Sequence, residues 1–181
     1  MHSIETTRLY LRSLRIDDLD DFALMGNDAE VMRFIGSGIT LSKDQTAIRL
    51  YSIIDHWTKH GFGLWAAIEK VSNAWMGFCG LQFLDHTQEI EVGYRLAKQF
   101  WGSGFATEAA RASLRYGFEQ LELNKIVAVV QPENFASQRV LEKSGLKYLR
   151  EDHFYNSRVK YFAITRDEYQ PDDSTYIQKS E

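Results

Sequence analysis

The sequence predicts a single α/β (α+β) domain built on one mixed β-sheet with helices packed against it. The hydrophobic periods run strand, helices, three strands, helix, strand, helix and two strands, which is not the regular alternation of a doubly wound fold. Residues 125–131 are almost wholly apolar, as expected of a strand that is covered on both faces. The length of 181 residues fits one domain whose core needs neither a disulfide nor a metal.

The N-terminal part of the chain predicts one strand followed by helices. Residues 7–14 alternate between apolar and polar side chains, with Leu9 and Leu11 on one face, which is typical of a half-buried strand. Two short helices should follow, one over residues 17–25 and one from residue 28.

A longer helix is predicted to begin after Ser42. Residues 42–45 form a capping box, in which the serine hydroxyl accepts a backbone N–H and Gln45 returns to the backbone of the serine. Gly61 fits the C-terminal cap of this helix. Its apolar residues at helical spacing are Ile48, Tyr51, Ile54 and Trp57.

Three strands are predicted next, over residues 64–69, 75–84 and 89–96. The short polar segment 71–74 between the first two reads as a hairpin turn. These strands are close together in the sequence, so we expect them to form antiparallel neighbours in the sheet.

The second half of the chain returns to helices alternating with strands. We expect a helix over residues 104–119, the apolar strand 125–131, a helix capped by Asn134 that ends near Gly145, and final strands over 146–151 and 159–165. Residues 1–166 then form the domain. Residues 167–181 are polar, and we expect a loosely held C-terminal tail there.

Composition excludes several classes of protein. The net charge of −4 argues against a nucleic-acid scaffold, which needs a basic surface. No apolar run is long enough to predict a membrane span, and the first residues do not resemble a signal peptide. A single cysteine, Cys79, forbids an internal disulfide and suits a reducing compartment, so we expect a cytoplasmic protein.

The most informative segment joins the strand 89–96 to the helix 104–119 through a loop with two glycines. A helix N-terminus offers unpaired N–H groups and partial positive charge, and glycines allow a phosphate to approach the backbone. A P-loop would need a Gly-Lys-Ser/Thr triplet, which the chain lacks. A dinucleotide site would need a third glycine where Thr107 stands. Coenzyme A is the third anionic ligand that such a loop can bind.

The motif that decides among these is Gln-Phe-Trp-Gly-Ser-Gly over residues 99–104. It resembles the pyrophosphate loop of the GNAT N-acetyltransferases, and Trp-Gly-Ser-Gly-Phe-Ala-Thr-Glu-Ala over 101–109 resembles their RimJ/RimL-like branch. The segments 5–9, 134–137 and 140–146 also resemble that branch, in the family's order. The resemblance covers about residues 5–166.

This resemblance implies a mostly antiparallel sheet splayed in a V between its fourth and fifth strands, with acetyl-CoA in the V. The pantetheine arm would pair with the fourth strand, a backbone N–H there would polarise the thioester carbonyl, and the pyrophosphate would lie on the loop. The cofactor-binding residues it implies are Tyr94, Arg95, Leu96, Phe100, Trp101, Gly102, Ser103, Gly104, Phe105, Ala106, Thr107 and Asn134.

The catalytic candidates are Ser137, Glu91 and His153. Many family members use a tyrosine to protonate the leaving thiolate, but the matching residue here is Leu141, so the resemblance to the RimL-like branch gives that role to Ser137. Glu91 and His153 are the candidate bases, although the alternation of Glu91 with its neighbours also fits a solvent-facing residue. For Ser137 and His153, the alternatives are helix capping and a surface loop.

The predicted activity is transfer of an acetyl group from acetyl-CoA to a primary amine by direct attack in a ternary complex. The acceptor is either a protein N-terminal α-amine or a small amine. The alternative is a non-catalytic CoA-binding regulatory module, and a nicotinamide-dependent oxidoreductase is the more distant one. His56 and His60 have metal-ligand spacing but no supporting third ligand, so no metal is expected. We expect no nucleic-acid or membrane partner, and the antiparallel sheet edges allow a homodimer.

Overall fold

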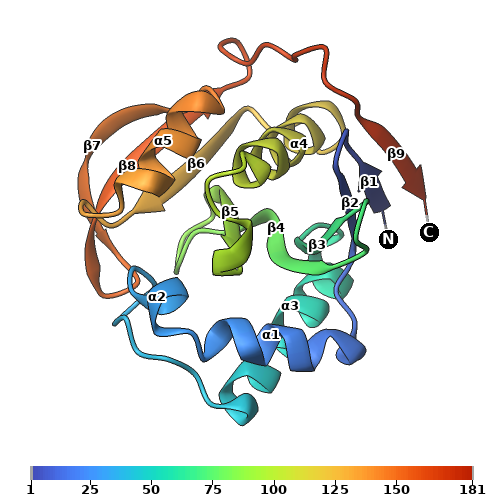
Figure 1. The fold of residues 1–181 in the computed structure, drawn as a ribbon. Helices are drawn as coiled ribbons and strands as arrows, with labels where there is room; N and C mark the ends of the chain where they lie inside the picture. The colour runs from blue at the N-terminus through green and yellow to red at the C-terminus, as the bar shows by residue number, and fades with distance from the viewer. Residues whose placement is uncertain (1, 181) are drawn as a thin grey trace.

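A computed structural model describes residues 2–180, which form one nine-stranded sheet in the order β7-β8-β6-β5-β4-β3-β2-β1-β9 (Figure 1). Neighbouring strands are antiparallel except β5 and β6, which are parallel. The strands are β1 (His2–Glu5), β2 (Leu9–Ser13), β3 (Leu64–Glu69), β4 (Trp75–Phe83), β5 (Ile90–Leu96), β6 (Lys125–Val130), β7 (Lys147–Phe154), β8 (Ser157–Thr165) and β9 (Ile177–Ser180). The predicted mixed, mostly antiparallel sheet is therefore confirmed.

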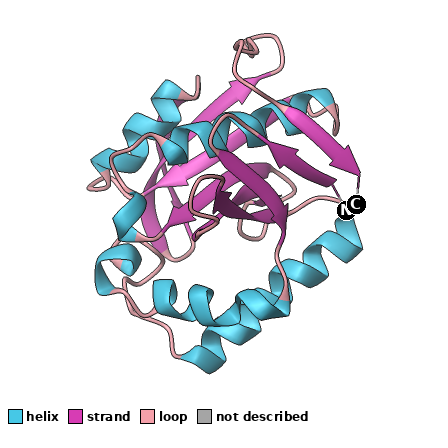
Figure 2. Cartoon of the chain, turned by 45° about the vertical axis from the view of Figure 1, so that its right-hand side comes forward, coloured by secondary structure: helices cyan, strands magenta, loops and turns pink. Residues whose placement is uncertain are grey.

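The strands lie between two groups of helices (Figure 2). The helices are α1 (Leu19–Gly26), α2 (Ala29–Met32), α3 (Lys43–His60), α4 (Phe105–Glu119) and α5 (Phe135–Lys143), with short 3-10 turns η1 (Ile16–Asp18) and η2 (Lys98–Phe100). One apolar cluster joins α1 and α3 to one face of β3 and β4, and a larger one joins α4 to the other face. No helix within residues 2–180 has the length and apolarity that crossing a lipid bilayer requires.

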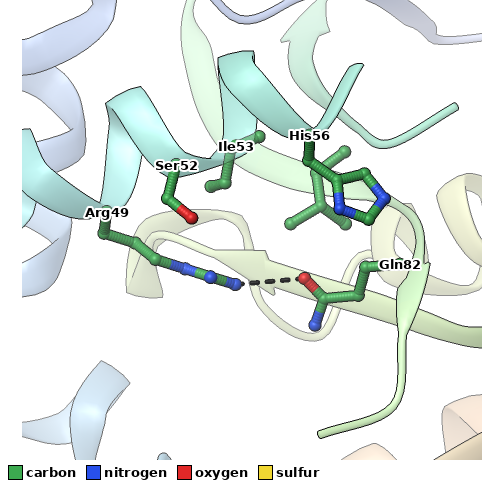
Figure 3. Close-up of a pocket in the computed structure, with 6 residues that line it drawn as sticks. Arg49, Ser52, Ile53, His56 and Gln82 are labelled. Carbon is green, nitrogen blue, oxygen red and sulfur yellow. Dashed lines mark hydrogen bonds between the residues drawn. The ribbon is translucent and has the colours of Figure 1, made fainter. Parts of the chain in front are cut away.

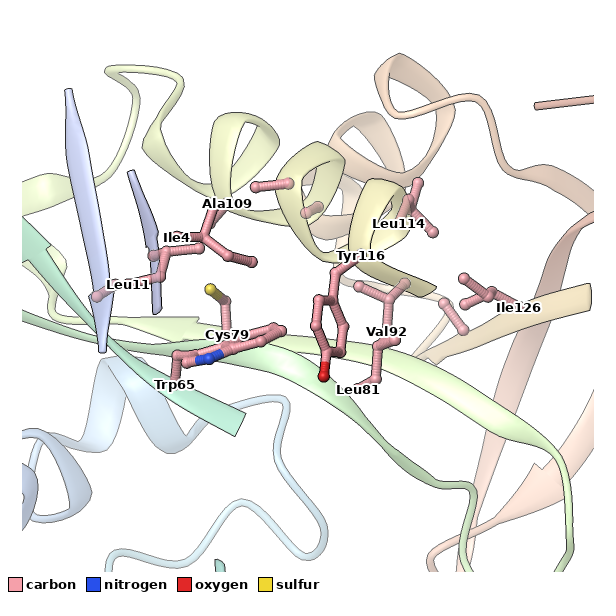
Figure 4. Packing of buried hydrophobic residues seen from close by; sticks show 14 of the residues in the cluster. Ile4, Leu11, Trp65, Cys79, Leu81, Val92, Ala109, Leu114, Tyr116 and Ile126 are labelled. Atoms are coloured by element: carbon pink, nitrogen blue, oxygen red, sulfur yellow. The ribbon is translucent and has the colours of Figure 1, made fainter. Parts of the chain in front are cut away.

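The larger cluster is built on the face of the sheet that α4 covers. Figure 4 shows Tyr116 reaching from α4 toward Leu81 and Val92 of the sheet. The ring of Tyr116 meets that of Trp65 edge to face, with 4.9 Å between the centroids. Cys79 lies fully buried in the same layer, and burial raises the pKa of its thiol to about 12, so the thiol is inert.

Helix α3 has the predicted ends but not the predicted face. Ser42 and Gln45 form both hydrogen bonds of the capping box, and Gly61 ends the helix in the left-handed conformation. The buried residues, however, are Thr46, Leu50, Ile53 and Trp57. The predicted stripe is wrong at Ile48 and Tyr51, which are 71% and 52% exposed, because the face that meets α1 and the sheet is rotated about the helix axis.

Two strands at one edge of the sheet were not predicted. Strand β1 pairs with β2, and β9 pairs with the other edge of β1, with Ile4 opposite Gln178. The expectation of a loosely held tail is therefore wrong at its end, because the backbone of residues 177–180 is tied into the ladder. The polar side chains of this segment suit an edge strand, so hydrophobicity alone does not reveal it.

The sheet opens between β5 and β6. Glu91 and Val127 form the one registered pair of these two strands in the described part of the chain, whereas β4 and β5 keep register over seven pairs. Among residues 2–180, no strand pairs with that side of β5 beyond Glu91, so the edge of β5 is free there. This is the predicted V between the fourth and fifth strands, counted without the unpredicted β1.

Candidate active site

The loop between β5 and α4 has the backbone of an anion site. Gly102 and Gly104 have φ values of 75° and 81°, a left-handed conformation that favours glycine. A Cβ atom on Gly102 would meet no atom within 4 Å, so the loop is open there. The loop is held to the end of β5, because the indole N–H of Trp101 donates to the carbonyl oxygen of Leu96 at 2.8 Å. The first N–H groups of α4 follow and have no partner within the helix.

This turn is held by an ion pair with the N-terminal segment. The carboxylate of Glu108 accepts hydrogen bonds from the backbone N–H and Nε of Arg8, both at 2.7 Å, and from the hydroxyl of Thr6 at 2.6 Å. Arg8 also donates to the carbonyl oxygen of Ser103 at 2.8 Å, and its guanidinium lies over the ring of Phe105. Sequence reasoning noted both motifs but missed that Arg8 and Glu108 join them.

The side chains of β5 divide between the two faces of the sheet. Leu96 belongs to the cluster under α4, and Tyr94 packs against that cluster. Arg95 lies on the opposite face, where its guanidinium stands 5.2 Å from the ring centroid of Phe78. The predicted cofactor residues 94–96 therefore share the free backbone edge of β5 but not a side-chain environment.

Ser137 and Tyr94 meet beside the opening of the sheet. The hydroxyl of Tyr94 lies 2.9 Å from Oγ of Ser137 and donates to the carbonyl oxygen of Ser137 at 3.1 Å. Asn134 caps α5 by accepting the backbone N–H of Ser137, so the serine hydroxyl itself is not needed for capping. Burial raises the pKa of Tyr94, which keeps the phenol protonated. Leu141 is buried in the core and offers no proton.

Glu91 is buried, and the solvent-facing alternative is wrong. The residue is 5% exposed, and its Oε1 accepts hydrogen bonds from Gln82 at 2.7 Å and from the hydroxyl of Tyr155. Burial raises the pKa of Glu91 to about 6, while the hydrogen bonds and the nearby Arg49 oppose that rise. Its Oε2 has no hydrogen bond within the described residues, so one carboxylate oxygen is left to bind a proton.

A small pocket lies next to this carboxylate (Figure 3). Its volume is about 40 Å³, and it is lined by Arg49, Ser52, Ile53, His56, Leu64 and Gln82. Arg49 is an exposed residue of α3, but its guanidinium turns inward and donates to Oε1 of Gln82 at 3.0 Å (Figure 3). Nε2 of His56 is buried without a hydrogen-bond partner, and burial lowers the pKa of this imidazole, which favours its neutral form.

His153 does not reach this group. It lies exposed on the edge strand β7, and its ring makes no hydrogen bond within the described residues. Tyr155, two residues later, occupies the turn between β7 and β8 and reaches Glu91 instead. The turn is fixed by reciprocal bonds, since the backbone N–H of Tyr155 donates to Asp85 and its hydroxyl accepts the backbone N–H of Asp85. Sequence reasoning missed Tyr155 and Gln82, which no local motif marks.

The backbone of this site suits a ligand with an anionic group and an amide chain. The free edge of β5 and the turn from Gly102 into α4 offer backbone groups that suit an amide chain and a phosphate, whereas the N–H groups of Phe100 and Trp101 already donate to the carbonyl oxygens of Ala97 and Lys98. Residues 2–180 contain no group of three or more potential metal ligands. The rings of His56 and His60 contact each other at a tilt, and they meet the rings of Phe62 and Phe83 edge to face, so aromatic packing accounts for their spacing.

Comparison with known proteins agrees with this geometry. The family described as Acetyltransferase (GNAT) domain matches residues 8–147. The N-acetyltransferase p20 of Bacillus licheniformis is 31% identical over 178 residues, which cover 93% of this chain and 99% of p20. YkkB of Bacillus subtilis (strain 168) is 35% identical over 164 residues, which cover 87% of this chain and 92% of YkkB.

Solved structures show the same fold. A GNAT-family acetyltransferase from Bacillus anthracis has a TM-score of 0.79 and 25% identity, covering 91% of this chain and 99% of its own. RimL, the ribosomal L7/L12 α-N-protein acetyltransferase with coenzyme A, has a TM-score of 0.75, 16% identity and 91% and 100% coverage. Spermidine N-acetyltransferase from Vibrio cholerae with CoA and spermine has a TM-score of 0.73, 22% identity and 90% and 98% coverage. The chain belongs to the GNAT acetyltransferase family and is an acetyl-CoA-dependent acyltransferase.

Proposed function

We propose that this enzyme acetylates a primary amine, either the α-amine of a peptide N-terminus or a small amine, by direct attack in a ternary complex. The observation that carries the proposal is the opening beyond Glu91 and Val127. It places the free edge of β5 and the glycine turn of α4 on one side, and the buried carboxylate of Glu91 at its closed end.

Acetyl-CoA is assigned to the opening. The backbone N–H groups of residues 102–107 hold the pyrophosphate, since those of Phe100 and Trp101 are already bonded. The edge of residues 94–96 holds the pantetheine arm and supplies the N–H that polarises the thioester carbonyl, and Asn134 with the start of α5 lines the other side. When bound, acetyl-CoA supplies the acetyl thioester. Arg8 stabilises the loop through Ser103, and its cationic charge beside the turn favours an anionic ligand.

Glu91 is assigned the role of proton acceptor. The attacking amine must be neutral, and an α-amine with a pKa of about 7.7–8.0 needs far less help than a lysine at about 10.4. A carboxylate with a pKa of about 6 is mostly ionised near pH 7 and accepts the proton at Oε2, directly or through a water molecule. Gln82 and Tyr155 hold the opposite oxygen and thereby fix the carboxylate.

Ser137 is assigned the role of proton donor to the leaving thiolate. A thiol has a pKa of about 8.5, so its thiolate needs only a weak acid near pH 7. The Oγ atom of Ser137 is hydrogen-bonded to the hydroxyl of Tyr94, which can return a proton to it. His153, exposed on β7, has no part in this assignment.

The names of the solved structures cover two kinds of amine acceptor. RimL is named for a protein α-amine, and the spermidine enzyme for a polyamine, so both kinds stay within the proposal. The motif resemblance favours the RimJ/RimL-like branch. We also propose a cytoplasmic location, which suits the single buried cysteine, and a monomer or a homodimer formed through the sheet edges.

The test is an acceptor screen in which the thiol of released CoA is detected. Peptides with free N-termini, polyamines, aminoglycosides and amino acids are offered together with acetyl-CoA. Thermal shifts with acetyl-CoA and with NAD run in parallel, because a ligand at 100 times its Kd stabilises by about 2.7 kcal/mol. Turnover with any amine supports the proposal. Stabilisation by acetyl-CoA without turnover favours the non-catalytic CoA-binding module, and stabilisation by NAD alone contradicts both.

A further inference from the structure

The face of β5 that carries Glu91 also carries a cation with no anionic partner among residues 2–180. The guanidinium of Arg95 lies between the ring of Phe78 and Sδ of Met32, to which Nη1 donates a long contact of 3.5 Å. Its Nε is buried and has no hydrogen-bond partner in the described part of the chain. A sulfur atom and the face of a ring are weak partners for a guanidinium.

No carboxylate compensates this charge. In residues 2–180, no ion pair joins Arg95 to Asp or Glu, and Glu91 is bonded to Gln82 and Tyr155 instead. The charged group that acts on the pKa of Arg95 is a second cation, Arg49. Burial and Arg49 together lower the pKa of Arg95 to about 10, so it stays charged near pH 7. Buried charges in proteins are normally paired, and the guanidinium of Arg95 has no ion pair within the described residues.

The surface of β5 between Glu91 and Arg95 carries no side chain, because a glycine lies there. Gly93 lies between them on the same face of β5 and pairs with Gly80 of β4. A Cβ at position 93 would meet only ordinary contacts, at 3.9 Å or more, so this position has space above it. Four residues of strand span about 13 Å, which accommodates an amino acid or the first residues of a peptide.

The loop after α2 closes this side of the site. The carbonyl oxygen of Gly36 accepts hydrogen bonds from Nε2 of Gln131 at 3.0 Å and from Oγ of Ser157 at 3.2 Å. The loop therefore bridges to the end of β6 and to the start of β8. Nε of Arg95 is itself buried, so water screens a charge pair with this guanidinium poorly.

We propose that the amine acceptor carries a carboxylate near its amine, and that Arg95, with Arg49 beside it, binds this carboxylate. The inference rests on the proposed acetyltransferase function and narrows its acceptor. It disfavours polyamines, because two guanidiniums repel a polycation. Two sources have the same chemistry: the α-carboxylate of a free amino acid, and an acidic side chain at the start of a peptide.

The experiment compares acceptors that differ only in this charge. One arm pairs free amino acids with their amides, and the other pairs N-terminal peptides that carry Asp or Asn at their second residue. Both arms are run with the wild type, with Arg95→Gln and with the control Arg33→Gln, which removes an exposed arginine of the neighbouring segment that stacks on Phe34. The readouts are kcat/KM and the thermal shift that each acceptor produces on the CoA-saturated protein.

The wild type is expected to prefer the carboxylate member of at least one pair by about tenfold or more in kcat/KM. Arg95→Gln should remove that preference, and Arg33→Gln should keep it. The arm that shows the preference identifies the source of the carboxylate. Equal use of both members by the wild type overturns the inference while the acetyltransferase function stands.

The thermal shift distinguishes the proposed carboxylate site from the proposed acetyltransferase activity. If nothing turns over but a carboxylate member stabilises the wild type and not Arg95→Gln, the anion site stands and the proposed activity fails. If no carboxylate member binds or reacts, the inference is overturned. It is also overturned if Arg95→Gln keeps the acceptor preference and weakens only acetyl-CoA binding, because the guanidinium then serves the cofactor.

Discussion

The hydroxyl of Tyr94 lies 2.9 Å from Oγ of Ser137, so one hydrogen bond joins a strand on one side of the sheet opening to a helix on the other. Both residues are half-buried, and Tyr94 packs against the core, where burial raises the pKa of its phenol. The proposed mechanism gives the role of proton donor to Ser137, with the phenol of Tyr94 as its hydrogen-bond partner.

The first prediction concerns this pair. Ser137→Ala should lower kcat by about 100-fold, within the range of a lost proton donor, with a small change in the KM for acetyl-CoA. The free energy of unfolding should fall by less than about 1 kcal/mol, because Asn134 still caps α5 through the backbone of residue 137. Steady-state kinetics and thermal denaturation measure the two effects.

Ser144→Ala is the matched control for that experiment. The Oγ of Ser144 donates to a carbonyl oxygen of the same helix, at the end away from the opening, so its loss should leave kcat within about twofold. A larger loss in Tyr94→Phe than in Ser137→Ala would make the tyrosine the donor and contradict the assignment.

A second prediction follows from the pKa of Glu91, which is about 6. With an acceptor amine of pKa about 8, log kcat/KM should rise with slope one between pH 6 and 8, and with slope two below pH 6, where both groups must lose a proton. Glu91→Gln should lower kcat/KM by about 100-fold or more and keep slope one throughout. In Glu89→Gln the break near pH 6 should remain, because Glu89 instead pairs with Lys125 and Tyr161.

Stability gives an independent check of the same pKa. Its folded value lies above the unfolded value of about 4.5, so the folded state binds the proton more tightly. Proton binding by Glu91 stabilises the folded state fully below pH 4.5. This stabilisation is lost as the pH rises through 6, which lowers the free energy of unfolding by about 2 kcal/mol. Wild type and Glu91→Gln should therefore have similar stability near pH 4.5, and the variant should be the more stable near pH 7.5. Denaturant unfolding at both pH values tests the sign, and the reverse order would mean that Glu91 is ionised at low pH.

The sequence predicts those parts of the fold that depend on local chemistry. Ser42 and Gln45 cap their helix as expected, and Gly61 ends it, because these signals need only a few neighbouring residues. The apolar face of α3 was misplaced at Tyr51, since a helix with scattered apolar residues fits more than one rotation until its packing partner is known. The sequence does not predict the edge strands β1 and β9, because they pair with each other although they lie at opposite ends of the chain.

The candidate site shows the same division. The loop around Gly102 could be found because its residues are contiguous, and a strand-to-helix turn dictates their conformation. The environment of Glu91 could not be found, because Tyr155 reaches it from a turn 64 residues away. Alternation along β5 indicated a solvent-facing side for Glu91, but α3 and the β7–β8 turn cover that side.

A third prediction uses two glycines with the same backbone. Gly102 and Gly61 have φ values of 75° and 74°, and a Cβ at either would meet nothing within 4 Å. Leucine at each position should cost about 1–2 kcal/mol in stability, from the left-handed conformation. Gly102→Leu should also weaken acetyl-CoA binding by tenfold or more, because its side chain occupies the approach to the loop. Calorimetric titration of both variants measures this difference in affinity for acetyl-CoA. Equal affinities would contradict the assignment of the pyrophosphate to this turn.

The last prediction concerns Arg8 and Glu108, which fix the loop from behind. Glu108 accepts three hydrogen bonds from Thr6 and Arg8, which lower its pKa against the opposing effect of burial. Glu108→Gln should lower the free energy of unfolding near pH 7 by about 1.5–3 kcal/mol, the usual range for hydrogen bonds to a charged group. Acetyl-CoA affinity should fall as well, because the carbonyl of Ser103 loses a fixed partner when Arg8 is released.

The pH dependence separates this ion pair from simple packing. The folded pKa of Glu108 lies below its ordinary value of 4.5, so its contribution is present above that pH and is lost as the pH falls through the folded value. The stability difference between wild type and Glu108→Gln should therefore shrink below pH 4.5, as measured by thermal unfolding across pH 3 to 7. Glu119→Gln is the control, because it breaks the i,i+4 ion pair with Arg115 on the same helix, far from the loop, and should cost less than about 0.5 kcal/mol. If the stability difference between wild type and Glu108→Gln stays constant with pH, the loss of stability comes from packing, and the ion pair does not stabilise the loop.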